Sequence, residues 1–587
     1  MTSPIILRKA PSNETKKNNN KSKDSNVVAV ETKHDEPSAA QSAARGTLAT
    51  ILLRVVSFAC TQWTMRRLDP TVLGQTAVQL ELVLTTVLFV SREGFRLALT
   101  RNVVASQQQQ QETVIDSWNV AWLSIPVVTL VAATALVYHL SVVTSLSLSS
   151  HASLDFKYGG ILYCVASCIE GWGEPAVLYS LRHWNVALKA AAEGAATIVK
   201  TFSTVFLLQA LTNHGQQHSS RPITAFGLAQ VLYACTYTLF LYAQTYRHLP
   251  PPKRSPWDAT TCRLTFLFTV QGFFKHLLTE GDRFVLTALS NDYEQGVYAM
   301  GSAYGGLAAR LLLQPLEENA RLLWSRFANT QTTLDKSQQQ RQSTRSLLQN
   351  SYVVLVKAVL YLGLIFSCIA VHYTSILLNI LAGQRWGQNT EAAAVLSAFC
   401  VYTAFLAANG MTEAFVYAVA SSATDLGRMG VAHTAVGLVF AVTAAVAVRH
   451  YSTVGLVAAN CLAMALRILY SLHFAARYFQ QQQSDETKDK PTPSFAAVLG
   501  RLLQQMSPPV LVWGAFACSW AATRTSLALF VEQTAAVPTA SLAWYKAAGF
   551  HVGVGAACAI GTLSLAYFLE TSFRRTAVAL FKGRKLD

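Results

Sequence analysis

Charged residues are scarce in this chain of 587 residues. Asp, Glu, Lys and Arg make up 13% of the sequence, while hydrophobic side chains make up 52%. A soluble chain carries roughly 25% charged residues. Long apolar runs recur between residues 46 and 570, and most reach the roughly 20 residues that an α-helix needs to cross a bilayer. The sequence therefore predicts an all-α polytopic membrane protein, because the strands of a membrane barrel would be shorter and would alternate in polarity.

Catalytic and metal-binding motifs are also missing. The sequence has no CxxC pair, no HExxH and no Asp-x-Asp. The segment from Gly194 to Thr201 shares a lysine and a threonine with phosphate-binding loops, but it lacks the glycine before the lysine and lies in an apolar run. Nearly all of the ten cysteines fall inside apolar segments, as buried small side chains do. We predict no enzyme, no cofactor and no metal site, with a membrane enzyme of scattered catalytic residues as the alternative.

The apolar runs predict about 14 transmembrane helices. They lie near 46–67, 71–91, 117–139, 158–180, 186–211, 225–247, 264–289, 296–324, 351–381, 392–421, 428–448, 453–478, 507–530 and 543–570.

Polar interruptions divide these helices into two six-helix lobes plus two C-terminal helices. We expect a disordered cytosolic tail at 1–42, an N-terminal six-helix lobe at 43–247, a basic linker at 248–263, a C-terminal six-helix lobe at 264–480, a polar cytosolic loop at 481–506, two additional transmembrane helices at 507–572 and a basic cytosolic tail at 573–587. The segments 326–350 and 480–500 and the glutamine runs are expected to be loops. Two similar halves are the usual plan of a secondary transporter, with the substrate site between them.

Lysines and arginines collect on alternate sides of the predicted helices. With a cytosolic N-terminus, the cytosolic side receives Arg92, Arg96, Arg101, Arg182, Lys253, Arg254, Arg326, Lys336, Arg341, Arg345, Arg428, Lys488, Lys490, Arg501, Arg574 and Arg575, and the opposite side receives few, including Arg66, Arg67, Lys157, Arg221 and Arg385. This asymmetry follows the positive-inside rule and predicts that both termini are cytosolic. It also accounts for the net charge of +16 without a nucleic-acid partner.

The seventh and eighth predicted helices carry charges that cost roughly 2.5–3.5 kcal/mol each at mid-bilayer. The seventh holds Gln271, Lys275, Glu280 and Arg283, of which the last two can pair at i,i+3 and leave Lys275 unpaired. A lined cavity would explain this density of charge. The alternative is a self-compensated helix end near the membrane surface.

The eighth predicted helix carries a polar stripe around a proline. Gln314, Glu317 and Glu318 lie on the stripe, and Pro315 is expected to kink the helix and act as a hinge. An ion-paired helix surface is the alternative explanation.

Further polar residues interrupt other predicted helices. They are Arg54 in the first, Arg92 and Arg96 closing the second, Glu174 in the fourth, Asn409 and Glu413 in the tenth, and Asn460 and Arg467 in the twelfth. Arg92 and Arg96 also fit ordinary anchors at a cytosolic helix end. Each of the others, taken alone, also fits an interhelical hydrogen bond. Together they give both halves inward-facing polar positions.

Seven motifs occur in a recognisable order. They are Ser91-Arg92-Glu93-Gly94-Phe95-Arg96, Gly173-Glu174-Pro175, Phe274-Lys275-His276-Leu277-Leu278-Thr279-Glu280-Gly281-Asp282-Arg283, Gln295-Gly296-Val297-Tyr298, Ala309-Arg310-Leu311-Leu312-Leu313-Gln314-Pro315-Leu316-Glu317-Glu318, Asn409-Gly410-Met411-Thr412-Glu413 and Val454-Gly455-Leu456-Val457-Ala458-Ala459-Asn460. With them the chain resembles the eukaryotic dolichol-linked oligosaccharide translocation protein family of the endoplasmic reticulum, within the multidrug/oligosaccharidyl-lipid/polysaccharide exporter superfamily. The long N-terminal tail and the additional acid Glu81 depart from the family pattern.

The resemblance implies a flippase of the endoplasmic reticulum membrane. Its substrate would be the dolichyl-diphosphate-linked heptasaccharide with five mannoses and two N-acetylglucosamines, moved from the cytosolic to the lumenal leaflet for protein N-glycosylation. Expected partners are this dolichol-linked oligosaccharide, membrane lipids and glycosyltransferases of the N-glycosylation pathway.

Together with the positions of the polar residues, the resemblance predicts a substrate site in which different residues bind the diphosphate and the sugars. The diphosphate would meet Arg54, Lys275, Arg283 and Arg467; the sugars would meet Gln271, Gln314, Asn409 and Asn460; Arg92, Arg96, Glu280, Glu317, Glu318 and Glu413 would complete the site; and Glu174 would be a cavity acid.

Two other functions remain open from the sequence. A non-transporting membrane scaffold would bind the glycolipid or organise glycosyltransferases. A drug exporter of the same superfamily would need a proton-cycling acid in the first half, for which Glu174 and Glu81 are the candidates.

Overall fold

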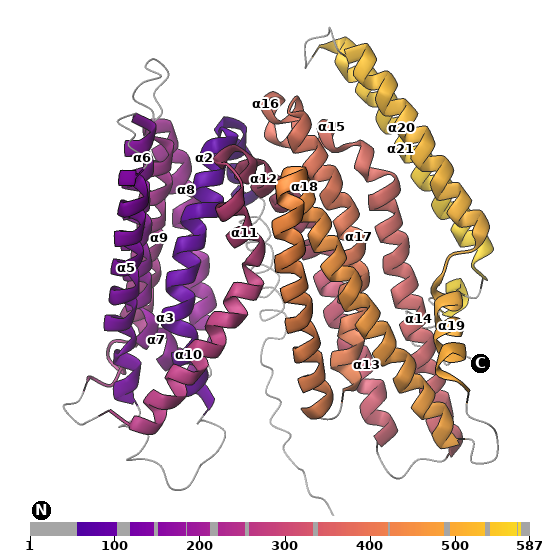
Figure 1. The fold of residues 1–587 in the computed structure, drawn as a ribbon, viewed down its shortest axis with the longest axis horizontal. Coiled ribbons are helices and arrows are strands. Elements are labelled where there is room, and N and C mark those ends of the chain that lie inside the picture. The colour runs from indigo at the N-terminus through magenta and orange to yellow at the C-terminus, as the bar shows by residue number, and fades with distance from the viewer. Residues whose placement is uncertain are drawn as a thin grey trace, which may run out of the picture. The chain divides into compact units, whose positions relative to one another are not determined.

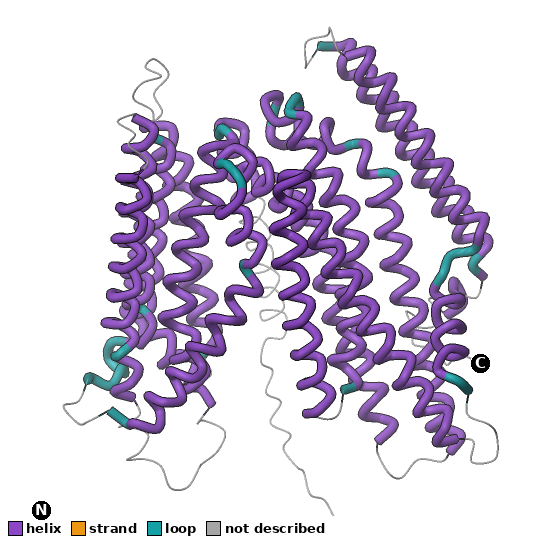
Figure 2. The backbone as a smooth tube through the Cα atoms, in the orientation of Figure 1, coloured by secondary structure: helices purple, strands orange, loops and turns teal. Residues whose placement is uncertain are grey.

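The protein is described here from a computed structural model. The structure describes residues 56–101, 118–145, 151–183, 185–211, 221–252, 257–332, 338–420, 423–486, 493–534, 541–571 and 573–576. These residues are almost entirely helical, and none of them forms a strand (Figure 2).

The described helices are shown in Figure 1. Residues 56–67 form a helix ahead of α2 (Pro70–Gly74), which continues through a π-helical segment (Gln75–Leu80) into α3 (Glu81–Arg101). Then come α5 (Ser124–Ser145), α6 (His151–Trp172), α7 (Glu174–Arg182), α8 (Val186–Leu211) and α9 (Pro222–Thr245). We call residues 56–67 together with α2–α9 the first half.

The chain continues with α10 (Ala259–Thr279), and the second half comprises α11–α18. Its elements are α11 (Gly281–Leu289), α12 (Asp292–Ala308), a π-helical segment (Ala309–Leu313), α13 (Gln314–Thr332), α14 (Gln338–Cys368), a 3-10 turn (Ala370–His372), α15 (Thr374–Ala382), α16 (Gln384–Gly387), α17 (Thr390–Val419) and α18 (Ala423–Glu486). The last elements are α19 (Phe495–Met506), α20 (Val510–Thr534) and α21 (Leu542–Leu569).

Membrane-spanning character is clear for much of this chain. Eight helices among the described residues are long and apolar enough to cross a membrane. Each predicted span falls mainly on helix where the structure describes it, with short breaks such as those in the fourth, seventh and ninth spans. The prediction of an all-α polytopic membrane protein is therefore confirmed, while the number fourteen and the division into six, six and two helices stay predictions.

Helix α18 is two spans joined at a sharp break. Its apolar part runs over 57 residues, Gly427–Gln483, which as one straight helix would extend roughly 85 Å, far beyond a hydrocarbon core of roughly 30 Å. Ser452 interrupts it with a φ of 51° and a ψ of −141°. Gly455 lies tightly against the backbone of Ala447, so the chain turns back there. The sequence predicted this division between the eleventh and twelfth spans.

The polar segments expected to be loops are mostly helical, which corrects that prediction. Helix α13 runs on to Thr332 and α14 already begins at Gln338, so the helices take up most of 326–350. Likewise α18 continues to Glu486, and α19 occupies much of the segment predicted as a polar loop at 481–506. Glutamine is a good helix former, so the runs at 338–340 and 480–483 extend helices. The run at 107–111 lies outside the described residues.

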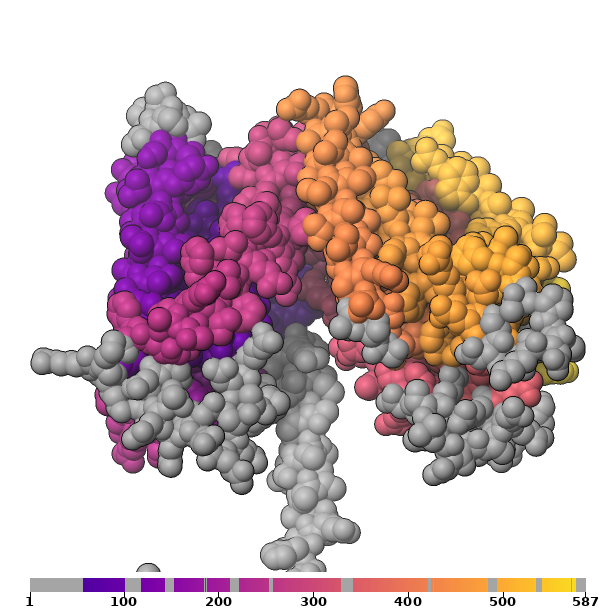
Figure 3. Space-filling view, turned by 60° about the horizontal axis from the view of Figure 1, so that its bottom comes forward, coloured from indigo at the N-terminus to yellow at the C-terminus, as the bar shows by residue number. Residues whose placement is uncertain are grey.

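The seventh predicted span is also not one continuous helix. Asp258 caps the start of α10 by accepting hydrogen bonds from the backbone of Thr260 and Thr261. The helix ends at Thr279, and Glu280 takes a φ of −97° and a ψ of 15° before α11 begins. Helix α10 packs on α3, where the absent side chain of Gly94 leaves room for the backbone of α10. On the other side, α11 packs beside α18, and this neighbourhood can be followed in Figure 3.

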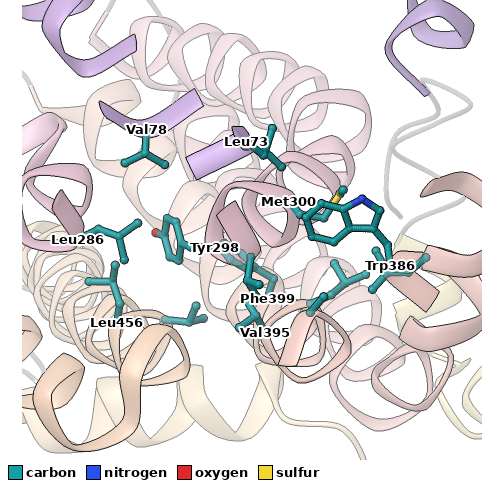
Figure 4. Close-up of a cluster of buried hydrophobic side chains, with 14 of the residues drawn as sticks. Leu73, Val78, Leu286, Tyr298, Met300, Trp386, Val395, Phe399 and Leu456 are labelled. Atoms are coloured by element: carbon teal, nitrogen blue, oxygen red, sulfur yellow. The ribbon is translucent and has the colours of Figure 1, made fainter. Parts of the chain in front are cut away.

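The largest buried hydrophobic cluster lies where the two halves meet (Figure 4). It joins Leu73 and Val78 of the first half to Met300, Trp386 and Phe399 of the second half. A second cluster lies inside the second half and contains the aromatic side chains of Trp324, Tyr352, Phe415 and Phe479. Burial of such large rings dominates the packing energy of these regions.

Backbone contacts tighten the same junction between the halves. Gly74 of α2 and Gly296 of α12 face each other so closely that a side-chain carbon on either would meet backbone atoms. Arg66 donates to the carbonyl of Leu381 at 3.0 Å, and the Trp386 indole donates to the carbonyl of Met65 at 3.1 Å. This end of the bundle is therefore held shut between the halves.

Candidate functional site

A cavity of about 790 Å³ lies among the helices of the first half, with one wall from α10. Its size falls within the range of ligand-binding pockets. Residues 56–68, α2, α3, α6, α8, α9 and α10 contribute to it. Its polar lining comprises Ser57, Thr61, Thr64, Thr76, Glu81, Thr85, Arg92, Glu93, Arg96, Tyr163, Glu170, Thr197, Lys200, Thr201, Thr204, Gln230, Tyr233, His276, Thr279 and Glu280.

Two arginines of α3 reach across to acids near the end of α6. Arg92 pairs with Glu170 at 2.9 Å. Arg96 makes two hydrogen bonds to Glu174, from Nε at 2.6 Å and from a terminal nitrogen at 2.7 Å. Such fork-to-carboxylate pairs are the strongest and most directional of ionic contacts. Both predicted arginines therefore line the cavity, and each is already neutralised by a glutamate.

The position of Glu174 follows from the local sequence. The helix breaks between α6 and α7 at Gly173, and Pro175 occupies the first turn of the new helix, where its missing N–H costs nothing. Glu174 stands in that first turn, where the helix dipole favours a negative charge. Its side chain is only 1% exposed. Glu174 is not among the residues that line this cavity but binds Arg96 from behind its wall, and its role as a cavity acid stays a prediction.

The acids that do line the cavity are Glu81, Glu93, Glu170 and Glu280. Glu280 pairs with Arg283 at 2.9 Å, which confirms the i,i+3 pair expected from the sequence. Glu81 begins α3 directly after the π-helical segment, so the wider turn there sets the direction of its side chain. The cavity wall thus mixes acids with bases and is not strongly cationic. Its charge alone does not discriminate between a glycolipid flippase and a drug exporter.

One cation of the cavity wall was not predicted. Lys200 lies on α8 with its ammonium 5.9 Å from the centre of the Tyr233 ring. Threonines 197, 201 and 204 lie on the same helix and also line the cavity. The sequence contained a signal, because a lysine within an apolar run is costly in lipid.

His276 also lines the cavity, although it was not among the predicted site residues. Its side chain is buried, its Nε2 lies 3.0 Å from the Thr86 hydroxyl, and its ring stacks on Phe89 at 4.7 Å. Through these contacts α10 is fixed against α3. The neighbouring residues Gln271 and Lys275 are exposed on α10 and are not among the residues lining this cavity.

A second polar cluster lies in the second half and joins three of the predicted residues. Arg467 contacts Glu413 at 3.1 Å, and the Asn409 amide donates to Glu413 at 3.0 Å. The His433 Nε2 lies 3.9 Å from the same carboxylate. The carboxylate of Glu317 lies against Gly410 on α17, one turn from this group. The structure therefore brings Asn409, Glu413 and Arg467 together, away from the cavity of the first half.

Asn460 belongs to a third, separate chain of hydrogen bonds. Its amide donates to the Tyr298 hydroxyl at 3.4 Å, and that hydroxyl donates to Asp282 at 2.8 Å. The chain links α18, α12 and α11. Asn460 therefore contacts neither the cavity of the first half nor the cluster around Glu413.

The remaining predicted residues are dispersed. Gln314 and Glu318 are exposed on α13. Pro315 stands in the first turn of α13, directly after the π-helical segment Ala309–Leu313, whose irregular hydrogen bonding accommodates the missing N–H. Its role as a hinge stays a prediction. Arg54 lies outside the described residues.

Solved structures with a similar fold are membrane transporters. An inward-facing multidrug resistance MATE family transporter of the MOP superfamily superposes with a TM-score of 0.51 and 13% identity, covering 70% of this chain and 92% of that one. The lipid II flippase MurJ, in an inward closed conformation, superposes with a TM-score of 0.52 and 10% identity, covering 89% of this chain and 98% of that one. At these identities the likeness shows the fold alone.

Sequence relatives extend over most of the chain. A Mus musculus protein named Man(5)GlcNAc(2)-PP-dolichol translocation protein RFT1 is 26% identical over 560 residues, which cover 91% of this chain and 95% of the relative. The protein of the same name from Yarrowia lipolytica is 30% identical over 487 residues, covering 74% of this chain and 69% of the relative. The family model described as Rft protein matches residues 38–579. The resemblance found in the sequence is thus confirmed, and this chain belongs to the Rft protein family.

Proposed function

We propose that this chain carries the dolichyl-diphosphate-linked heptasaccharide with five mannoses from the cytosolic to the lumenal leaflet of the endoplasmic reticulum membrane. The relatives that share most of its length are named as translocation proteins for this lipid. No catalytic step is part of the proposal, since movement between leaflets makes and breaks no covalent bond.

The cavity of the first half is the observation that carries the proposal. A polar head group meets a large free-energy barrier in hydrocarbon unless other polar groups replace its water. The cavity supplies threonine hydroxyls, two arginine–glutamate pairs and a lysine inside a helical membrane fold. Large apolar side chains such as Leu130, Phe206 and Leu239 are exposed on the outer surfaces of the helices, where they suit contact with lipid. The glycan head would therefore travel inside the protein while the dolichol stays in the bilayer.

Translocation by this fold requires that the two halves move relative to each other. The contacts that hold one end shut are Gly74 against Gly296, Arg66 on the carbonyl of Leu381, and the pair of Asp69 with Arg385. These contacts would separate when the cavity opens toward that side. The distribution of lysines and arginines favours a lumenal location for the end of the bundle that holds these contacts. It also favours cytosolic termini.

Reconstitution tests the proposal. Purified full-length protein would be placed in liposomes with the five-mannose dolichyl-diphosphate oligosaccharide, and an added membrane-impermeant mannosidase would digest only glycans in the outer leaflet. We expect the protected inner-leaflet pool to become accessible with time in vesicles that contain the protein, and to stay protected in protein-free vesicles.

The rival scaffold function predicts the opposite result in the same assay. A scaffold would leave the inner-leaflet pool protected while glycosyltransferases of the pathway still co-purified with the protein. A drug exporter would also leave that pool protected. It would instead move small organic cations in exchange for protons.

A further inference from the structure

Lys200 lies in the middle of a membrane-spanning helix, where a charged side chain has its highest free-energy cost. The helix segment Ala187–Leu211 is long and apolar enough to span the membrane, and Lys200 lies near its middle. An ionisable side chain at that depth is rare unless it faces a partner or a water-filled cavity. Lys200 lines the cavity of the first half.

The surroundings of Lys200 differ from those of the other cations in that cavity. Arg92 and Arg96 each make an ion pair with a glutamate. No carboxylate lies within ion-pair distance of the Lys200 ammonium among the residues the structure describes, and the nearby aromatic face belongs to Tyr233. An aromatic face attracts an ammonium group without neutralising its charge. The Lys200 side chain is therefore not engaged by a carboxylate among the described residues, and it can reach an anion that enters the cavity.

Gln230 provides an independent sign of an unfilled site. It lies on α9, three residues before Tyr233 and thus on the same helix face. Its side chain is 2% exposed, lines the cavity, and has an amide oxygen without any hydrogen-bond partner. A buried polar atom without a partner is costly, and a ligand hydroxyl would satisfy it.

The threonines of α8 complete the same wall. Thr197 and Thr204 donate their hydroxyl protons to carbonyls of their own helix at 2.7 Å. Their oxygen lone pairs remain free to accept from a ligand hydroxyl. One wall thus combines a cation for an anionic group with several acceptors for hydroxyl groups.

We propose that Lys200 and Gln230 bind a sugar diphosphate, with Lys200 holding the phosphate and Gln230 accepting from the sugar next to it. The inference rests on the proposed function and adds to it the part of the substrate that this wall recognises. Neither inorganic diphosphate nor a sugar-free lipid diphosphate would use both residues.

Binding to the purified full-length protein in detergent tests this proposal with three probes. The first is phytanyl diphosphate bearing two N-acetylglucosamines, the second is phytanyl diphosphate without sugar, and the third is inorganic diphosphate. The variants are Lys200→Met, Lys200→Arg and Gln230→Leu. Lys189→Met is the matched control, because Lys189 lies on the same helix, pairs with Glu193 at 3.5 Å and does not line the cavity.

We expect Lys200→Met to weaken the binding of both lipid diphosphates at least tenfold. The affinity of Lys200→Arg should stay within about threefold of that of the wild type. Lys189→Met should bind both probes as the wild type does. Gln230→Leu should weaken only the sugar-bearing probe. Inorganic diphosphate should bind more weakly than either lipid. Equal binding of the sugar-bearing probe by wild type and Lys200→Met would overturn the proposal.

Thermal unfolding without ligand separates binding from a purely structural role. Replacement of a polar amine that has no carboxylate partner by an apolar side chain should leave the unfolding temperature of Lys200→Met equal to or above that of the wild type. A lowered unfolding temperature would assign Lys200 to structure and contradict the proposal. If the wild type transfers the glycolipid while Lys200→Met transfers it equally well, only this inference fails. If the wild type transfers none, the proposed function itself fails.

Discussion

Both halves of the chain hold an arginine–glutamate pair among their helices, but the two pairs are built differently. Arg96 grips Glu174 with two nitrogens, and the glutamate is 1% exposed. Arg467 reaches Glu413 with one nitrogen, leaves its buried Nε without a partner, and shares that carboxylate with Asn409. The first pair holds a lining arginine with two hydrogen bonds, whereas the second leaves polar atoms without partners. The fully satisfied pair in the first half supports the proposed head-group site there.

The largest effect should come from breaking the pair in the first half. Arg96→Leu leaves the Glu174 carboxylate buried without a counter-charge, which typically costs roughly 3–5 kcal/mol of folding free energy. Unfolding of the purified variant in detergent measures this loss. The double variant Arg96→Leu with Glu174→Leu removes both charges and should recover most of it. A single variant as stable as the wild type would show that the pair is not a structural element.

Arg467→Leu makes the same change in the second half and should have a smaller effect. The pair is more exposed, with side chains 28% and 13% accessible, so water can solvate the remaining glutamate. We expect a loss of roughly 1.5–3 kcal/mol, as for a hydrogen bond to a charged group. The unfolding free energies of the two variants would be measured under the same conditions. If Arg467→Leu lost as much stability as Arg96→Leu or more, the first pair would not be the stronger of the two.

Glycine substitutions compare the junction of the halves with an open helix surface. Gly296→Ala places a methyl group against the backbone of Pro70 and should destabilise the protein by roughly 1–3 kcal/mol. Gly553→Ala on α21 meets open space and should stabilise its helix by roughly 0.5–1 kcal/mol. Thermal unfolding of the two variants should therefore shift in opposite directions. Equal shifts would show that α2 and α12 are not in close contact.

The smallest destabilisation should come from the start of α10, which lies outside both polar sites. Asp258→Ala removes a helix cap and should cost about 1 kcal/mol, while Asp258→Asn should restore most of it. Hydrogen bonds from Thr261 and the backbone hold the pKa of Asp258 below its usual value. The stabilisation by this carboxylate is therefore present at neutral pH and is lost as the pH falls through that lowered pKa. The difference between wild type and Asp258→Ala should shrink in acid, and a constant difference would contradict the assignment.

The sequence predicted those parts of the structure that depend on local spacing. Apolar runs located the helices, and the i,i+3 spacing of Glu280 and Arg283 predicted their ion pair. Asn409 and Glu413 were expected to form hydrogen bonds between helices, but the structure also joins them to each other within α17. The break at Glu280 was not predicted, because Gly281 is the one mark of it in the sequence and this glycine does not adopt the left-handed φ typical of a helix end.

Contacts between distant segments could not be read from spacing. Glu170 and Glu174 meet the arginines of α3 across 78 residues of chain, and nothing in either segment specifies that partner. For the same reason the predicted site gave equal weight to both halves, while the cavity proved to lie among the helices of the first half. The role of Lys200 could not be predicted, because it depends on the side chains of α9 that lie beside it in the fold.

The most direct test of a head-group site in the first half is to map where the glycolipid head contacts the protein. A dolichyl-diphosphate oligosaccharide with a photoreactive group on its first sugar would be crosslinked to the full-length protein in liposomes, and the labelled peptides identified by mass spectrometry. We predict labels in residues 81–96 of α3 and 197–204 of α8, reduced in Lys200→Met. Labels confined to residues 409–467 of the second half would contradict the central claim.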